Sequence, residues 1–472
     1  MCNFAKIASS KTRAQLCAVS PSPELRDRIQ RQLRAFRGTA ELSALSNLLS
    51  FRFPVRTGMN DGVVRPSDYL RVEAPLSLTR FAPAARIPLR GELRVAVVLV
   101  DFQDKQISVT KEHIEDLFFS TGQIPTGSVK EYYNEVTKGL VEIMGEVIGP
   151  LTLPHPIGFY TNGQSGLGDT APNAQSMALD AAVAADPQID FTPFDNDGDG
   201  FVDAYVIVHA GRGAEETGNN QDVWSHKWVL PGGALQADQT RIFGYLTVPE
   251  DCKLGVCAHE LGHLLFGFPD LYDIDNSSEG IGNWCLMAGG SWNGRGDTPA
   301  HPSAWCKVQQ NWAPVVTPTG ASHISLEDVK QSGQIIHVGP LSGDKSEYFL
   351  IENRQKTLFD RELPGDGLLV WHVDDKVLDN THENHPKVAL LQADGQRDLE
   401  NAANRGDGGD PYPGASSNAS IDTNTSPSTR LYSGVDSQIG IAQISPPGPV
   451  MTFDLDVSAT ARRSPRRHRT AA

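Results

Sequence analysis

The chain has 472 residues, which corresponds to about three domains of ordinary size. Hydrophobic residues make up 39% of it and charged residues 21%, with 44 Gly and 31 Pro, and this composition excludes a collagen, a coiled coil and a chain that is disordered throughout. The net charge of −16 argues against a nucleic-acid partner, and the most apolar strip, residues 95–100, is too short for a membrane span.

The charge is distributed unevenly along the chain. Residues 1–90 hold 15 Lys and Arg against 6 Asp and Glu (+9), and residues 459–472 hold five Arg and no acid (+5), so the stretch between them carries −16 − 9 − 5 = −30. A basic leader of this kind could dock on the acidic body as an inhibitory prosegment, or it could be a solvated arm. No apolar run in the first thirty residues is typical of a conventional signal peptide.

The leader is predicted to be helical. Apolar residues recur at helical spacing in residues 21–50, beginning with Leu25, Ile29 and Leu33. Residues 51–90 are rich in Pro, Gly and Arg without periodicity, which indicates an exposed connector where proteolysis could remove the leader. We therefore expect a prosegment at residues 1–90.

An α/β domain is predicted for residues 91–315. It begins with the continuous apolar strand 95–100, and a Ser-x-x-Glu capping box at Ser128 and Glu131 then opens a helix. Further elements are expected as a helix at 174–185 and strands at 202–210 and 242–248. Strands that alternate with helices indicate a sheet covered by helices.

After Trp312 the pattern changes to short strands separated by turns. Seven are predicted, at residues 323–326, 334–338, 348–352, 367–373, 388–392, 439–444 and 450–457. They favour an all-β sandwich at residues 316–458, with a long polar loop at 401–430. Residues 459–472 are expected to form an Arg-rich disordered tail.

Two histidines lie one helical turn apart in the segment His259-Glu260-Leu-Gly-His263. At this spacing both imidazoles project from one face of a helix and can bind a tetrahedral zinc ion. Glu260 can then act on a zinc-activated water as general base and afterwards as general acid. Apolar neighbours bury this helix, and Gly267 can end it in a left-handed cap.

The segments that follow, Phe268-Pro-Asp-Leu-Tyr-Asp273 and Asn283-Trp-Cys-Leu-Met-Ala-Gly-Gly-Ser-Trp292, resemble the immune inhibitor A family of secreted zinc metalloendopeptidases, which are metzincins. The likeness covers about residues 92–457. It implies a metzincin-like catalytic domain with a mixed sheet and an active-site helix, and Met287 as an apolar floor beneath the metal. The family is typically made with an N-terminal prosegment, which matches the basic leader in role.

The third zinc ligand departs from the metzincin pattern. Gly267 and Asp270 each lie one residue later than that pattern requires, and Phe266 is a plausible extra residue. Asp270 is the first choice for the ligand because a bulge at the end of the helix could absorb one residue. Glu279 is the main alternative and Asp273 another. Tyr272 and His301 are candidates for the group that stabilises the oxyanion.

A calcium loop is predicted at Asp195-Asn-Asp197-Gly-Asp199-Gly-Phe201-Val-Asp203. Its carboxylates occupy the first positions of an EF-hand-like loop, although Val206 stands where the bidentate glutamate would be. The expected calcium ligands are Asp195, Asp197, Asp199, Asp203 and the carbonyl of Phe201. A plain acidic turn is the alternative.

Four cysteines cluster near the zinc motif: Cys252, Cys257, Cys285 and Cys306. We expect two local disulfides and an oxidising compartment, with reduced core thiols as the alternative. In the leader, Cys17 or Cys2 could cap the zinc as a latency switch, or could remain a free or paired thiol.

The sequence therefore predicts a secreted, monomeric zinc endopeptidase that hydrolyses proteins or peptides and is held inactive by its own leader. The alternative is a secreted binding or adhesion protein in which the zinc is purely structural. An intact Glu260 favours the enzyme, because a structural zinc site has no use for a general base. A peptide substrate could pair with an edge strand such as residues 242–248, in a cleft lined by Trp224, His226 and Trp228. The alternative is that these three residues belong to the aromatic core.

Overall fold

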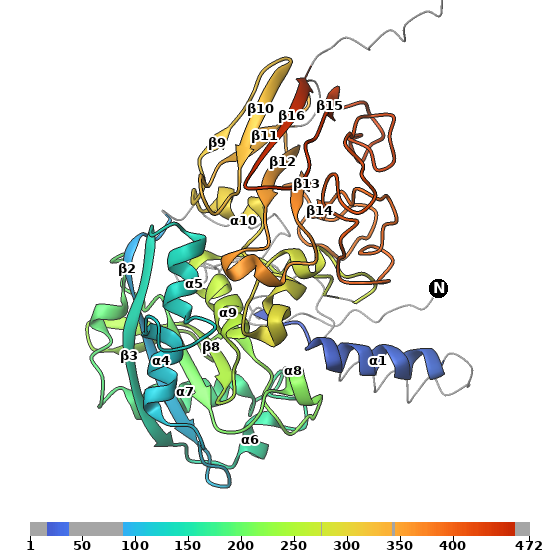
Figure 1. Cartoon of the computed structure of the whole chain (residues 1–472). Helices are drawn as coiled ribbons and strands as arrows, with labels where there is room; N and C mark the ends of the chain where they lie inside the picture. Colours follow the sequence, from blue (N-terminus) through green and yellow to red (C-terminus); the bar gives the residue numbers. More distant parts are fainter. Residues whose placement is uncertain (1–16, 37–87, 275, 342–344, 458–472) are drawn as a thin grey trace, which may run out of the picture.

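The computed structural model describes residues 17–36, 88–274, 276–341 and 345–457. Figure 1 shows an α/β part, which contains most of the helices, joined to a β-rich C-terminal part. Helix α9 (Leu254–Phe266) lies in the α/β part close to where the two meet. None of the described helices is both long and apolar enough to cross a bilayer.

A six-stranded mixed sheet forms the centre of the α/β part. Its order is β1-β5-β8-β4-β2-β3, and β2, β3, β4 and β8 run parallel to their neighbours in this group. β5 is antiparallel to β8, and the short strand β1 extends the sheet as an antiparallel edge. The strands are β1 Cys17–Ala18, β2 Gly91–Asp101, β3 Val141–Thr152, β4 Tyr205–His209, β5 His226–Val229 and β8 Gly244–Pro249.

Helices and one small hairpin accompany this sheet. The helices are α1 Pro23–Phe36, α4 Lys111–Phe119, α5 Val129–Val136, α6 Ile157–Thr161, α7 Ala174–Ala185, α8 Ala214–Thr217, α9 and α10 Ala304–Gln309. The hairpin strands are β6 Leu235–Ala237 and β7 Thr240–Ile242. One continuous apolar core joins the helices to the sheet.

The C-terminal part contains two further sheets, ordered β10-β16-β15 and β14-β13-β12-β11-β9. Apolar residues from both sheets share one core, as the predicted sandwich requires. The strands are β9 Val315–Val316, β10 Ser322–Glu327, β11 Ile335–Val338, β12 Glu347–Arg354, β13 Gly367–Asp374, β14 Val388–Leu390, β15 Ile439–Ala442 and β16 Val450–Val457.

Most of the predicted elements are present. The capping box of α5 is complete, with Ser128 and Glu131 each bonding the other's backbone N–H, and α7 spans the predicted residues. All seven predicted C-terminal strands are found. The predicted leader helix is found as α1, while its predicted continuation at 37–50, most of the connector and the tail lie outside the described residues.

The prediction of one edge strand at residues 242–248 is wrong. The chain leaves the β6–β7 hairpin at Ile242, and β8 starts at Gly244. β8 then lies inside the sheet between β5 and β4, so it offers no unpaired edge for a substrate.

Candidate metal centre

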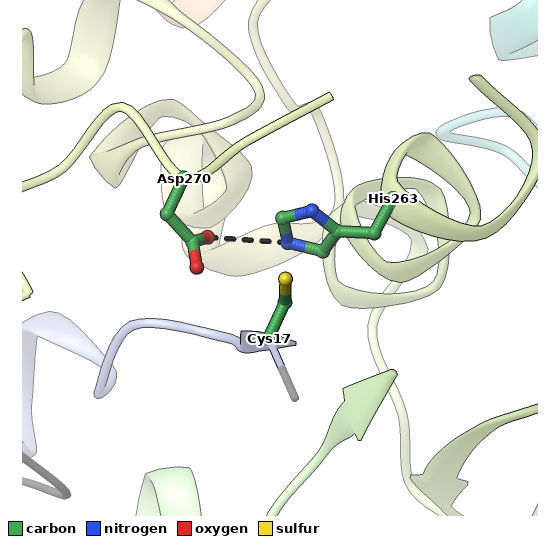
Figure 2. Close-up of side chains that lie close together, drawn as sticks. All are labelled: Cys17, His263 and Asp270. Carbon is green, nitrogen blue, oxygen red and sulfur yellow. Dashed lines mark ion pairs between the residues drawn. The ribbon is translucent and has the colours of Figure 1, made fainter. Parts of the chain in front are cut away.

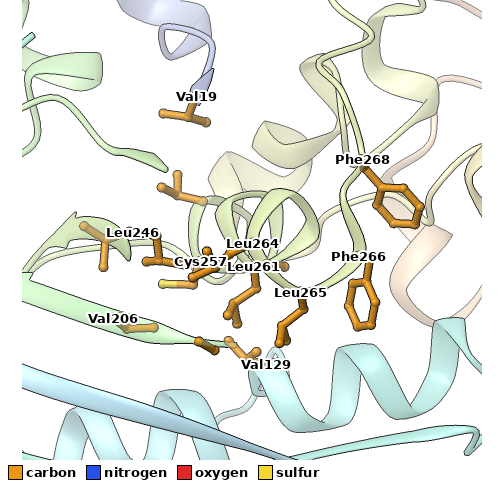
Figure 3. Packing of buried hydrophobic residues seen from close by; sticks show 14 of the residues in the cluster. Val19, Val129, Val206, Leu246, Cys257, Leu261, Leu264, Leu265, Phe266 and Phe268 are labelled. Atoms are coloured by element: carbon orange, nitrogen blue, oxygen red, sulfur yellow. The ribbon is translucent and has the colours of Figure 1, made fainter. Parts of the chain in front are cut away.

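Helix α9 carries the His-Glu-x-x-His segment and is buried along its whole length. Figure 3 shows apolar side chains of α9 packed towards α5, β4 and β8, while Val19 of the leader lies on another side of the helix. The helix ends at Gly267, whose φ of 68° is left-handed and whose N–H caps the carbonyl of His263. This turn brings the chain back towards the histidines.

Gly262, which precedes His263 on α9, is in close contact with Met287. A Cβ placed on Gly262 would lie 2.8 Å from the sulfur of Met287, so a larger residue would displace it. Met287 is fully buried and its carbonyl accepts the N–H of Leu271 at 2.7 Å. The segment after the helix is thereby bonded to Met287.

Backbone carbonyls orient both imidazoles. His259 Nδ1 lies 2.9 Å from the carbonyl of Leu286, and His263 Nδ1 lies 2.5 Å from the carbonyl of Phe268. A carbonyl only accepts, so each Nδ1 carries a hydrogen, and in a neutral ring Nε2 is then left with its lone pair. Both histidines are therefore in the tautomer that binds a metal through Nε2.

The lone pairs converge on Asp270. Its Oδ1 lies 3.1 Å from each Nε2, and the two Nε2 atoms are 3.0 Å apart. Three such atoms repel one another unless positive charge lies between them. Burial lowers the pKa of His263, which disfavours a proton as that charge.

These residues fit a zinc ion. Zinc with ligand distances of about 2.0–2.2 Å separates tetrahedral ligands by roughly 3.4 Å, close to the separations of the three donor atoms. Two imidazole nitrogens and one carboxylate oxygen are also ligand types that zinc takes in catalytic sites.

Glu260 is fully buried next to this cluster. Neither of its carboxylate oxygens has a hydrogen-bond partner within the described part of the chain. Burial raises the pKa of Glu260 well above its ordinary value, and the charges of Asp270 and Glu215 raise it further. A buried acid without a partner is costly in a structural role, and it suits a group that exchanges protons with a bound molecule.

The other acidic candidates lie elsewhere. Glu279 accepts a hydrogen bond from Arg26 at 3.1 Å, and Asp273 accepts bonds from Ser277 and Ser278 within its own turn. Asp270 is thus the acidic residue that the structure brings to both histidines.

The two oxyanion candidates differ in position. The Tyr272 hydroxyl donates to the carbonyl of Ala18, which is the residue after Cys17. His301 Nε2 instead bonds to Glu135 of helix α5.

The acidic loop is only partly assembled as predicted. Oxygens of Asp195, Asp197 and Asp199 lie within 4.8 Å of one another, but this group does not include Asp203. Asp203 accepts the N–H of Asn196 at 2.6 Å. N–H groups of the loop itself donate to the other three carboxylates.

A third group of acids was not singled out from the sequence. Carboxylate oxygens of Asp394, Asp407 and Asp410 lie within 4.8 Å of one another in the C-terminal part. Asp410 accepts hydrogen bonds from the indole of Trp284 and the N–H of Asp407, and burial raises the pKa of Asp410 to about 7. No periodicity or spacing in the sequence joins these positions.

The prediction of two local disulfides is wrong for the described cysteines, which form none. The sulfur of Cys285 accepts the N–H groups of Met287 and Ser303, and the sulfur of Cys306 accepts the Ser303 hydroxyl. These buried thiols are part of the core's hydrogen bonding. Disulfides therefore lend no support to an oxidising compartment.

Sequence comparison identifies the family of the α/β part. The sequence model of the immune inhibitor A peptidase M6 catalytic domain matches residues 94–315, which include α9 and the segments on either side of it. This region of the chain, residues 94–315, belongs to the immune inhibitor A peptidase family. Immune inhibitor A of Bacillus thuringiensis subsp. alesti is 30% identical over 297 residues, which cover 50% of this chain and 43% of that protein.

The chain is also similar to the pre-pro-metalloprotease PrtV of Vibrio cholerae serotype O1 (strain M66-2). It is 29% identical over 270 residues, which cover 45% of this chain and 29% of that protein. The chain thus matches less than half the length of either relative.

Proposed function

We propose that this protein is a zinc-dependent endopeptidase. The observation that carries the proposal is the meeting of His259 Nε2, His263 Nε2 and Asp270 Oδ1 within 3.1 Å. Beside them lies the buried carboxylate of Glu260, which has no hydrogen-bond partner among the described residues. When bound there, zinc supplies a Lewis acid that polarises a peptide carbonyl and lowers the pKa of a water molecule. Membership of a peptidase family supports the same conclusion.

Glu260 is the proposed general base and acid. Its raised pKa lets it accept a proton from water and hold that proton until the leaving amine needs it. Burial raises the pKa of Glu260 and the backbone of Val19 lowers it, so this residue of the leader lies close to the proposed base.

The proposed substrate is an extended peptide. β1 pairs antiparallel with β5, so that Cys17 lies opposite Lys227 and Ala18 opposite His226. A peptide substrate can take the same edge of the sheet when β1 leaves it. Tyr272 would then donate to a substrate carbonyl, as it now does to Ala18.

The leader is the proposed inhibitor, because it lies on this edge. We further propose that the enzyme is secreted and monomeric, following the family resemblance. We also keep calcium as a structural ion of the acidic loop, supported by the three clustered carboxylates of Asp195, Asp197 and Asp199 and by the left-handed backbone of Gly198 and Gly200.

Casein hydrolysis tests the proposed function. Residues 51–90 contain seven arginines, so limited trypsin digestion of the zinc-loaded chain is a practical way to remove the leader. We expect the processed protein to cleave casein and the Glu260→Gln variant to be slower by about 10²–10⁴-fold with unchanged zinc content. Equal casein cleavage by both proteins would refute the mechanism, and no cleavage by the processed wild type would favour the adhesion protein with a structural zinc.

A further inference from the structure

The leader places a thiol at the metal centre. The sulfur of Cys17, a ring nitrogen of His263 and a carboxylate oxygen of Asp270 lie within 4.8 Å of one another, and all three residues are buried. Figure 2 shows the Cys17 side chain pointing from β1 towards the imidazole of His263 and the carboxylate of Asp270. More than 240 residues separate the cysteine from these partners in the sequence.

Three consecutive backbone carbonyls after Cys17 are held by aromatic side chains of the body. Ala18 accepts from the Tyr272 hydroxyl at 2.5 Å, Val19 from the Trp224 indole at 2.9 Å and Ser20 from the Trp292 indole at 3.0 Å. The N–H of Val19 adds a bond to the carbonyl of Ser225. These contacts fix the register of β1 and hence the position of the thiol.

Helix α1 anchors the segment from its other end. Arg26 is only 3% exposed and bonds to Glu279, Asn276 and the carbonyl of Ser278. A buried ion pair of this kind adds little net stability, but it penalises any shift in register because a shift would leave a charge unpaired. Leu25 and Ile29 join the main apolar core.

With Cys17, the centre holds four side chains of the kinds that a closed zinc site uses; the sulfur is grouped within 4.8 Å with donor atoms of His263 and Asp270, and this group does not include His259. Structural zinc sites have four protein ligands, whereas catalytic sites keep one position open for water or substrate. Two imidazoles, one carboxylate and one thiolate make four. A thiol beside a metal ion loses its proton and binds as thiolate.

We propose that Cys17 is the fourth zinc ligand of the uncleaved chain and that this bond keeps the enzyme latent. The inference rests on the proposed function and names the atom through which the leader inhibits. The thiolate occupies the position that water needs, while β1 occupies the edge that a peptide needs. Removal of the leader opens both at once.

X-ray absorption at the zinc edge tests the bond without relying on activity. The full chain loaded with zinc should show one sulfur neighbour at about 2.3 Å, and Cys17→Ser should show only nitrogen and oxygen neighbours at about 2.0–2.2 Å. Cys252→Ser is the matched control, because this partly exposed cysteine is not among the donors at the centre, and it should keep the sulfur signal. A wild-type spectrum without sulfur would overturn the proposal, and that measurement needs no variant to fold.

Latency provides the second readout. If the bond between Cys17 and zinc keeps all but a minor fraction of molecules latent, its loss should release activity. We expect full-length Cys17→Ser to cleave casein at least about tenfold faster than the uncleaved wild type. Equal latency of the two proteins would also overturn the proposal. If the processed wild type fails to cleave casein, the proposed peptidase function fails instead, and the sulfur signal still decides the ligand.

Discussion

The metal centre and the acidic loop are both predicted from the sequence to bind metal, but their side chains are held in different ways. At the metal centre, carbonyls of Leu286 and Phe268 take the outward nitrogens of both imidazoles, so every remaining lone pair points inwards. In the acidic loop, carboxylates of Asp195 and Asp199 accept N–H groups from their own turn, and Asp199 is exposed.

The difference shows what distinguishes a prepared metal site from a cluster of ligands. Orientation by surrounding groups lowers the cost of bringing several lone pairs together before the metal arrives. The acidic loop can satisfy its carboxylates without any ion, so a calcium ion there would add stability without being indispensable. Four single substitutions test these sites, given in order of decreasing expected effect.

Asp270→Asn should weaken zinc binding by at least about 100-fold. Mutation of a residue that only hydrogen-bonds to a metal ligand costs about 10–100-fold, and loss of the ligand itself should cost more. Zinc affinity of the leader-free protein, measured by competition with a chelator, checks this. Glu279→Gln is the control and should retain wild-type affinity, since Glu279 pairs with Arg26 in the full chain. The reverse result would make Glu279 the ligand.

Tyr272→Phe should lower kcat/KM of the processed enzyme by about tenfold, which is the worth of one hydrogen bond of about 1.4 kcal/mol. The hydroxyl holds the carbonyl of Ala18 in the leader and would hold a substrate carbonyl after processing. Steady-state kinetics on a peptide substrate measure the effect. An unchanged kcat/KM would show that the contact belongs to the leader alone.

Glu215→Gln should change how stability depends on pH. Burial raises the pKa of Glu215 from 4.5 to about 7, so the folded protein binds more protons than the unfolded chain between these values, and stability falls as pH rises through that range. The variant loses this dependence and should gain up to about 3 kcal/mol relative to wild type between pH 4.5 and 7. Urea denaturation at several pH values measures the difference, and parallel curves for the two proteins would contradict it.

Asp197→Asn should have the smallest effect and only in calcium. A hundredfold excess of calcium over its Kd would raise the Tm of the wild type by about 5 °C, and the variant should lose most of this gain. Asp186→Asn, an exposed acid outside the loop, is the control. If calcium leaves the wild-type Tm unchanged, the loop is a plain acidic turn.

Local patterns predicted local structure well. Capping of α5 by Ser128, the end of α9 at Gly267 and the C-terminal strands all follow from residues close in sequence. The pairing of β1 with β5 joins residues about 210 positions apart, and no periodicity records it. The prediction of one strand at residues 242–248 failed for a related reason. A continuous apolar run does not show that a hairpin strand ends at Ile242 and that a new strand starts at Gly244.

The site was predictable to a similar degree. Spacing alone places both histidines and Glu260 on one helix, but the choice among Asp270, Glu279 and Asp273 depends on how the chain turns after Gly267. The sequence does not show that Glu279 is paired with Arg26 of the leader and therefore is not the third ligand. The number and clustering of the cysteines near the motif predict disulfides. They do not show that backbone N–H groups donate hydrogen bonds to the sulfur of Cys285.

Anomalous diffraction at the zinc edge from crystals of the zinc-loaded chain would locate the metal itself. We expect one strong peak within about 2.0–2.2 Å of Nε2 of His259, Nε2 of His263 and a carboxylate oxygen of Asp270. The absence of a peak there, or a peak on other side chains, would contradict it.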